Sequence, residues 1–217
     1  MRAEKQTSEV RRRQIARAAM ALIAGQGMKG LSVASVARKV GLVPSALYRH
    51  FKGKEEILEA TIELVRDLLL ENVQVVRQES NRPLEQLKLL LIRHIRMVRE
   101  FQAIPRIVFS EEISASHPLR KEAIYKILTE YLGQVAEIII QGQRLGQINP
   151  ALDPKTISVM FLGIVQPPIV LWYLSNGKFE VTKQAKRGWE IFKKAIQAEE
   201  PRAVSLKKKG LQWAKNK

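Results

Sequence analysis

The sequence contains no cysteine among its 217 residues. This absence excludes a disulfide framework, a zinc site built on thiolates and a cysteine nucleophile. Long apolar runs are also missing, because the longest, residues 160–165 and 169–174, are too short to cross a bilayer. Residues 1–6 are not followed by the apolar stretch of a signal peptide. We therefore expect a cytoplasmic protein without a membrane partner.

Alternating polar and apolar runs, which would predict β-strands, are absent, and so is a glycine-rich phosphate loop. Apolar residues instead recur at helical spacing along most of the chain. The sequence therefore predicts an all-α fold of about nine helices. A chain of 217 residues can bury a substantial core as one large unit or two smaller ones.

Negative charge is scarce, and the formal net charge is +16. Within residues 1–54 the only acids are Glu4 and Glu9, against a dozen lysines and arginines. A basic surface attracts polyanions through counterion release from phosphates. The alternative is that the charge only keeps the protein soluble. The clustering in this first quarter favours double-stranded DNA as the partner over a membrane surface.

Residues 32–54 form the most informative motif, two short helices joined by a glycine turn. Ser32 can cap the first helix, and Gly41 follows its last apolar residue, where a left-handed backbone is common. Pro44 suits the first turn of the second helix because its missing N–H would have no partner there. The apolar face of the first helix consists of Val33, Val36, Ala37 and Val40. This spacing is that of a helix-turn-helix, although an ordinary helical hairpin has it too.

The residue types in this region point to one family. The segment Leu47-Tyr48-Arg49-His50-Phe51-Lys52-Gly53-Lys54-Glu55-Glu56-Ile57-Leu58 resembles the end of the recognition helix and the start of the next helix in TetR-type transcriptional regulators. Residues 31–37 and Gly41 match the same pattern. The resemblance covers about the first quarter of the chain and implies a three-helix DNA-binding domain, followed by a helical ligand-binding and dimerisation domain.

The resemblance also implies which residues contact DNA. Ser32, Tyr48, His50 and Lys54 would bind phosphates, and Arg49 is the candidate for reading a guanine, because its guanidinium can donate twice to one base. The other residues expected to face the groove are Ala34, Pro44, Ser45 and Ala46.

Some of these residues also have purely structural interpretations. Tyr48 could be a half-buried core residue, Lys54 a solvated charge and His50 a packing residue. Val43 departs from the pattern, since relatives often have a capping Ser or Thr there, and a valine forgoes up to about 1 kcal/mol of local stability. The arginines of residues 11–13 oppose the dipole at the start of the first helix, so they either bind phosphate or leave a frayed helix start.

The rest of the chain predicts long amphipathic helices, at residues 54–77, 84–101, 119–145, 154–175 and 182–198, with a short one at 107–113. The helix at 154–175 is apolar on nearly all sides and should be covered by a neighbour. Together with the last helix it would pair with the same helices of a second subunit, as the resemblance implies; the other interpretation is that these residues fill the core. Candidate interface residues are Met160, Ile164, Trp172, Trp189 and Phe192.

The resemblance further implies a ligand cavity among the middle helices. The candidate lining residues are His94, Met97, Phe101, Phe109, Tyr125 and Phe161, each of which could equally be plain core. Because polar side chains are few there, we expect an apolar small-molecule effector. Its binding would favour a conformation in which two recognition helices no longer fit a palindromic operator, so that a repressor is released.

We therefore expect three segments: a DNA-binding domain at residues 1–54, an effector-binding and dimerisation domain at 55–200, and a basic tail at 201–217. The tail is a solvated end, an aid to non-specific DNA binding, or a helix that packs on the body through Leu206, Leu211 and Trp213. An architectural DNA-binding protein without an effector is the rival interpretation. Three scattered histidines without a nucleophile motif argue against an enzyme, and we expect no metal and no cofactor.

Overall fold

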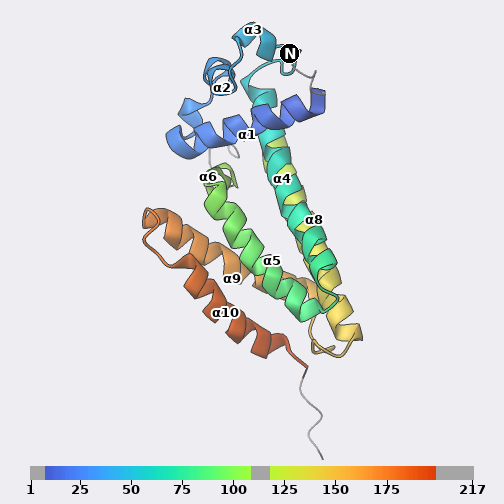
Figure 1. Ribbon diagram of the computed structural model, residues 1–217. Coiled ribbons are helices and arrows are strands. Elements are labelled where there is room, and N and C mark those ends of the chain that lie inside the picture. The colour runs from blue at the N-terminus through green and yellow to red at the C-terminus, as the bar shows by residue number, and fades with distance from the viewer. Residues whose placement is uncertain (1–7, 109–117, 199–217) are drawn as a thin grey trace, which may run out of the picture.

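The computed structural model describes residues 8–108 and 118–198. Within these ranges it contains nine α-helices, one short 3₁₀ helix and no β-strand. The chain forms a small head near the N-terminus and a longer body below it (Figure 1). The predicted all-α fold, with a small N-terminal unit followed by a longer helical one, is thus confirmed.

The head consists of α1 (Ser8–Gln26), η1 (Met28–Gly30), α2 (Val33–Lys39) and α3 (Pro44–Leu47). Helix α1 lies across the head, between α2 and α3 on one side and the body on the other (Figure 1). Gly27 and Gly41 both have positive φ, 68° and 69°, at the ends of α1 and α2. Glycine takes this backbone without a steric penalty, so both helices end where the sequence places a glycine.

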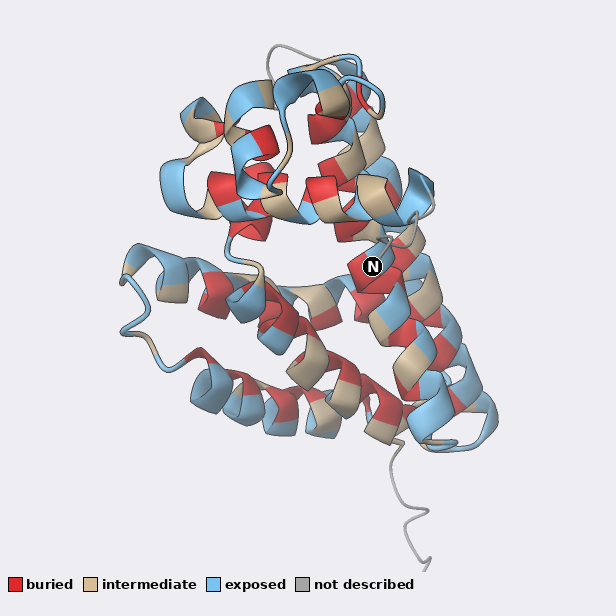
Figure 2. Ribbon diagram, turned by 45° about the horizontal axis from the view of Figure 1, so that its top comes forward, coloured by how far each residue is buried: buried red, intermediate tan, exposed pale blue. Residues whose placement is uncertain are grey.

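The body consists of α4 (Lys54–Glu79), α5 (Pro83–Glu100), α6 (Ala103–Val108), α8 (Pro118–Arg144), α9 (Pro154–Leu174) and α10 (Val181–Ile196). Helix α4 runs from the head down the length of the molecule beside α8 (Figure 1). Buried positions face the interior, whereas α9 and α10 keep exposed positions on their outer sides (Figure 2). One continuous apolar core, which includes Ile15, Phe51, Val73 and Phe161, links the head to the body.

Three arginine–glutamate pairs join α4 to α8. Arg66 donates to both oxygens of Glu130 at 2.8 and 2.7 Å, and Arg77 donates to Glu137 at 2.7 Å. Near the head, Arg120 of α8 pairs with Glu55 in the first turn of α4. Bidentate arginine–carboxylate pairs fix geometry as well as charge. These pairs therefore hold the two longest helices in register along their whole contact.

The predicted helix ranges agree with the structure to within a few residues, except between α5 and α8. The sequence suggests a break at Pro105 and a short helix at 107–113, whereas α6 begins at Ala103 and includes Pro105 in its first turn. Proline is tolerated there because the first N–H groups of a helix have no intrahelical partner. Residues 109–113 lie outside the described part of the chain.

Helix α9 contains Pro167 and Pro168 and still runs unbroken from Pro154 to Leu174. Asp153 caps its start by accepting the N–H of Thr156 at 2.7 Å. By length and composition α9 is the one helix among the described residues that could span a membrane, and a third of its most apolar window is buried. Core helices of soluble proteins pass the same test.

Candidate DNA interface and effector cavity

Helix α2 is held by a reciprocal pair of serine caps. Ser32 Oγ accepts the Ser35 N–H at 3.0 Å, and Ser35 Oγ accepts the Ser32 N–H at 2.9 Å. These bonds satisfy donors that a helix start leaves free. The sequence prediction of a cap at Ser32 is confirmed, and Ser32 and Ala34 remain exposed at the start of the helix.

Helix α3 presents a short polar face above two buried anchors. Leu47 and Phe51 are 0% and 1% exposed, which fixes the rotation of the helix about its axis. On the outside lie Pro44, Ser45, Tyr48 and Arg49, and Ala46 is half-buried. Tyr48 is 56% exposed, so it is not the half-buried core residue of the structural interpretation.

The start of α3 confirms the expectation that Val43 provides no side-chain cap. No side chain caps this helix, and Pro44 occupies its first turn. Two backbone bonds, from the Tyr48 N–H to the Pro44 carbonyl at 3.1 Å and from the Phe51 N–H to the Leu47 carbonyl at 3.1 Å, extend the helical turn beyond Leu47. The short helix therefore depends on its neighbours for its position.

Arg12 of α1 supplies much of that support. Its guanidinium lies 4.1 Å from the centroid of the Phe51 ring, donates to the His50 carbonyl, and donates to Glu56 Oε1 at 3.0 Å. Glu56 also accepts the Lys52 N–H at 2.7 Å. This backbone bond, followed by the bond from Arg12, lowers the pKa of Glu56. One arginine thus ties α1 to the end of α3 and the start of α4.

This clamp gives Arg12 a role that the sequence did not suggest. Phosphate contact and a frayed helix start were the two interpretations of residues 11–13, but Arg12 turns toward the protein. Arg12 and Glu56 are 44 positions apart. No local pattern connects residues at that distance, so only the folded head reveals the pair.

The two remaining residues of the predicted interface differ in accessibility. Lys54 is exposed at the start of α4, with its Nζ 3.5 Å from the Met28 carbonyl. His50 is half-buried, and its Nδ1 is buried without a hydrogen-bond partner in the described structure. The ring of His50 therefore turns one nitrogen inward, which agrees with packing better than with a fully presented phosphate ligand.

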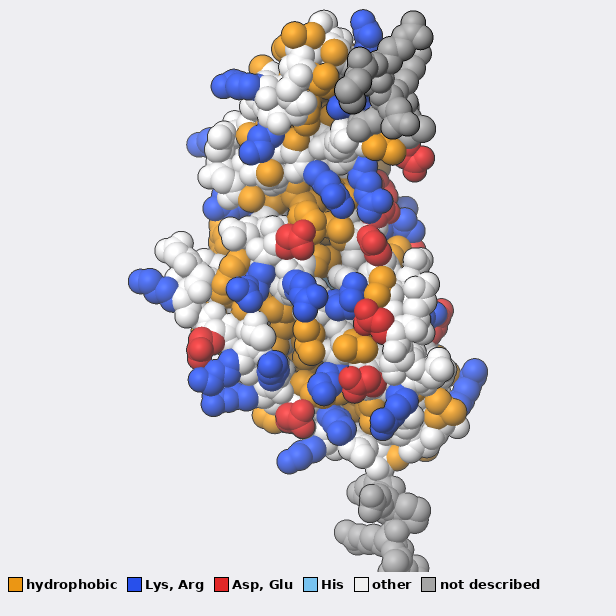
Figure 3. Space-filling model, in the orientation of Figure 1, with side chains coloured by type: hydrophobic (Ala, Val, Ile, Leu, Met, Phe, Trp, Pro, Cys, Tyr) orange, Lys and Arg blue, Asp and Glu red, His pale blue; other side chains and the backbone are white. Residues whose placement is uncertain are grey.

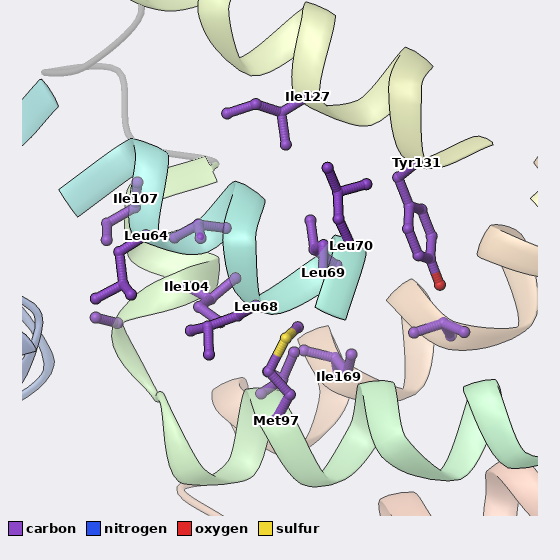
Figure 4. Close-up of a cluster of buried hydrophobic side chains, with 14 of the residues drawn as sticks. Leu64, Leu68, Leu69, Leu70, Met97, Ile104, Ile107, Ile127, Tyr131 and Ile169 are labelled. Carbon is purple, nitrogen blue, oxygen red and sulfur yellow. The ribbon is translucent and has the colours of Figure 1, made fainter. Parts of the chain in front are cut away.

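A cavity of about 50 Å³ lies inside the body, between α4, α5, α6, α8 and α9. His94 and Tyr131 are its paired polar groups, and the Tyr131 hydroxyl points from α8 toward α5 (Figure 4). His94 Nδ1 and the Tyr131 hydroxyl are 3.1 Å apart. Burial lowers the pKa of His94 to about 4 and raises the pKa of Tyr131, so both groups are neutral near pH 7.

Among the predicted cavity residues, only His94 lines this cavity. Met97 and Phe101 line a separate polar hollow near α1, and Phe161 is fully buried against Phe192, with ring centroids 6.0 Å apart. Tyr125 is 67% exposed on α8 and does not line the cavity, and Phe109 lies outside the described residues.

The other lining residues were not predicted from the sequence; they include Leu69, Leu128, Leu162, Gln166 and Ile169. Helical spacing places several of them on inner faces, but it does not distinguish a cavity wall from solid core.

The predicted interface residues of α9 and α10 divide into two groups. Met160 is 52% exposed, and Ile164 and Trp172 are half-buried. Trp189 and Phe192 are each only 3% exposed and pack inside the protomer, so they support α10 from within instead of presenting a surface. The outer apolar face consists of Val159, Met160, Val170, Leu171 and Leu174 of α9 and Ile191 of α10.

Within the described residues, no group of three or more histidine, aspartate and glutamate side chains is placed to hold a metal ion. The most enclosed titratable pair, His94 and Tyr131, is surrounded by apolar side chains. Its arrangement is that of a polar contact in an apolar cavity.

Comparisons with known proteins agree with this architecture. The sequence model described as "Bacterial regulatory proteins, tetR family" matches residues 15–61, and that described as "YsiA-like protein, C-terminal region" matches residues 64–195. The fatty acid metabolism regulator protein of Bacillus subtilis is 24% identical over 84% of this chain and 94% of its own length.

Two further relatives cover most of the chain. The nucleoid occlusion factor SlmA of Vibrio vulnificus is 23% identical over 81% of this chain and 89% of its own length. The structure of the fatty acid degradation regulator FadR from Bacillus halodurans superposes with a TM-score of 0.73, at 23% identity, over 88% of this chain and 97% of that one. The two family matches together span both parts of the fold, and the chain belongs to the tetR family of bacterial regulatory proteins, which are DNA-binding regulators of transcription with a helix-turn-helix head.

Proposed function

We propose that this protein is a ligand-responsive repressor that binds a palindromic operator as a homodimer and is released by a small apolar effector. The observation that carries the proposal is the exposed face of α3, which is fixed from below by Leu47, Phe51 and Arg12. A reader helix must be rigid before it meets DNA, because ordering it on binding would cost affinity. We expect it to act in the cytoplasm.

The DNA roles follow from accessibility and chemistry. Arg49 is exposed and can donate two hydrogen bonds to a guanine, while Pro44, Ser45 and Ala46 would lie against neighbouring base edges. Ser32, Tyr48 and Lys54 would bind phosphates, with Ala34 close to the groove. We assign His50 a supporting place in this set because one of its ring nitrogens is already buried.

Dimerisation would use the outer faces of α9 and α10. One short helix makes few base contacts, whereas two copies related by symmetry read both halves of a palindrome. Gly163 is exposed on α9, and Gly188 of α10 lies beside Ile164 of α9. Small residues there would let the helices of two subunits approach closely, with Met160, Ile164 and Trp172 around them, in a four-helix arrangement.

The effector would enter the cavity around His94 and Tyr131. At about 50 Å³ this cavity is several times smaller than a typical ligand pocket, so binding would have to enlarge it. Such an effector would bind the conformation with the enlarged cavity more tightly than the conformation seen here. This difference in affinity would shift the protein toward an altered arrangement of α4, α5, α6, α8 and α9. Two relatives are regulators of fatty acid metabolism or degradation, so an acyl chain is the first effector to test.

A second candidate function is DNA binding without an effector, as in an architectural protein. The small size of the cavity and the similarity to a nucleoid occlusion factor favour it. The two functions differ in one property, which is whether an apolar compound changes the affinity for DNA.

The test begins with the selection of bound duplexes from a random pool. We expect a twofold-symmetric site, and Arg49→Ala should relax the preference at one base pair in each half-site, worth about 1–3 kcal/mol. Lys54→Ala is the matched control, since it should weaken binding to all duplexes equally and reduce the salt dependence. Recovery of no preferred sequence would contradict the proposal.

The effector is tested on the selected duplex with a panel of apolar and acyl compounds. A compound that releases the operator should lose its effect in Leu162→Phe, which fills the cavity wall while leaving the head intact. Release that persists in this variant, or a panel without any effect on DNA affinity or melting temperature, would favour the architectural function.

A further inference from the structure

A long groove lies on the outside of the body, where α5 and α10 run side by side. Its central part has a volume of about 860 Å³, and its floor includes Ile92 and Ile95 of α5 and Trp189 of α10. Trp172 of α9 closes one end. Two smaller hollows continue it, one sharing Trp189 and the other sharing Trp172. The groove therefore follows the α5–α10 contact for much of its length.

The rim of this groove is positively charged. Lys88, Arg96 and Arg99 of α5 and Lys186 of α10 line it, together with Glu100 and Glu190. On the face formed by α5 and α10, apolar side chains lie between lysine and arginine side chains (Figure 3). Four cations against two carboxylates leave a net charge of +2 around an apolar floor.

Unlike several arginines elsewhere in the body, these two lysines and two arginines have no ion-pair partner in the described part of the chain. Arg93, one turn away on α5, pairs with Glu79 at 3.0 Å, and Arg66 and Arg77 pair with glutamates of α8. Among the described residues, none of the four rim cations forms an ion pair or a side-chain hydrogen bond. Both indole N–H groups, of Trp172 and Trp189, likewise donate to no acceptor in the described structure.

We propose that this groove is a second ligand site, and that it binds an anionic amphiphile with an aromatic or alkyl body and a single acidic head group. The apolar body would lie along Ile92 and Trp172, which are half-buried in the groove wall, with Trp189 beneath it at 3% exposure. The head group would lie between Arg99 and Lys186, which face each other from α5 and α10 and border both the central groove and the hollow beside it.

The groove is separate from the His94 cavity and shares Trp172 with the residues proposed for the dimer interface. Its α10 residues, Lys186, Trp189 and Glu190, occupy a different side of the helix from Ile191, which belongs to the outer apolar face. The His94 cavity shares no lining residue with it. Its volume lies in the range of drug-sized ligand pockets, whereas the cavity of about 50 Å³ does not. A ligand can therefore bind here without opening the core.

The probe for this site is 1-anilinonaphthalene-8-sulfonate, with N-phenyl-1-naphthylamine as the matched uncharged molecule. The protein is the full chain with Trp213→Phe, so that Trp172 and Trp189 are the remaining indoles. We expect saturable binding of the sulfonate with energy transfer from these indoles, and at least tenfold weaker binding of the amine. The far-ultraviolet circular dichroism should stay unchanged.

The variant Arg99→Gln with Lys186→Gln should weaken sulfonate binding about tenfold and leave amine binding unchanged. Lys121→Gln with Lys155→Gln is the matched control, because it removes the same charge from exposed positions outside the groove. Equal effects of the two double variants would overturn the proposal, as would sulfonate binding that is absent or is lost in Leu162→Phe instead. None of these results depends on DNA binding, so failure here leaves the proposed function standing.

Discussion

His94 and Tyr131 form a fully enclosed hydrogen-bonded pair in the body, with His94 Nδ1 3.1 Å from the Tyr131 hydroxyl and their ring centroids 5.6 Å apart. Helices α5 and α8 contribute one residue each. A neutral imidazole can accept the phenolic hydrogen at Nδ1, whereas a protonated imidazole can only donate to the phenolic oxygen, so the direction of this bond depends on the protonation state of His94.

This pair predicts a loss of stability in acid. Burial lowers the pKa of His94 from its ordinary value of 6.5 to about 4. The unfolded chain therefore takes up a proton below about pH 6.5, while the folded protein resists until about pH 4. The contribution is complete above pH 6.5 and is lost as the pH falls to about 4, at a total of about 3 kcal/mol. Urea unfolding at several pH values measures it.

The matched control for this prediction is His94→Gln, which keeps a hydrogen-bonding side chain but does not titrate. The difference in unfolding free energy between wild type and variant should shrink by about 3 kcal/mol between pH 7 and pH 4, because the carboxylates titrate in both proteins. A difference that stays constant with pH would show that His94 is accessible to protons in the folded state.

Arg12→Gln should destabilise the head and weaken DNA binding. It removes the contact with the Phe51 ring, the bond to the His50 carbonyl and the pair with Glu56, at a cost of about 1–2 kcal/mol. Chemical denaturation and operator binding measure the two effects. Arg13→Gln is the control, because Arg13 lies 3.6 Å from Glu71 on the surface and its loss should cost under about 0.5 kcal/mol. Equal destabilisation by the two variants would contradict the role of Arg12.

Arg106 of α6 joins the head to α9. Its Nη1 donates to the Ile23 carbonyl in the last turn of α1 at 3.2 Å, and its guanidinium lies 5.5 Å from the centroid of the Tyr173 ring. We expect Arg106→Met to speed hydrogen exchange at the Gly27 amide, which donates to the same carbonyl, while exchange within α8 stays unchanged. Protection of Gly27 that is the same in variant and wild type would exclude a stabilising role for this contact.

Gly163→Leu tests the proposed dimer. A Cβ added at this exposed position meets no atom within 4 Å in the protomer, and leucine favours helix over glycine by about 1 kcal/mol. The protomer should therefore stay folded while the partner helices are held apart, and sedimentation should show monomers. Gly133→Leu on α8 is the matched control, exposed and equally free of neighbours. Dimers that survive Gly163→Leu would place the interface elsewhere.

Sequence patterns were sufficient for the helices and the head, and insufficient for contacts between distant segments. The predicted helices at 54–77 and 84–101 differ from α4 and α5 by one or two residues at their ends, and the predicted cap at Ser32 and uncapped start at Val43 both appear. These features depend on neighbouring residues, so local spacing reveals them. Trp189 and Phe192 were misjudged because helical spacing shows that a face is apolar but does not say which neighbour covers it. The contact of Arg12 with Phe51 and the groove between α5 and α10 both join residues that are far apart in the sequence. No local pattern predicts them.

The three arginine–glutamate pairs between α4 and α8 bear on how a signal could cross this molecule. Glu55 lies in the first turn of α4, next to the head. Its pair with Arg120 of α8 therefore restricts independent movement of this end of α4. The head would instead be displaced when α4 and α8 move together as one rigid unit.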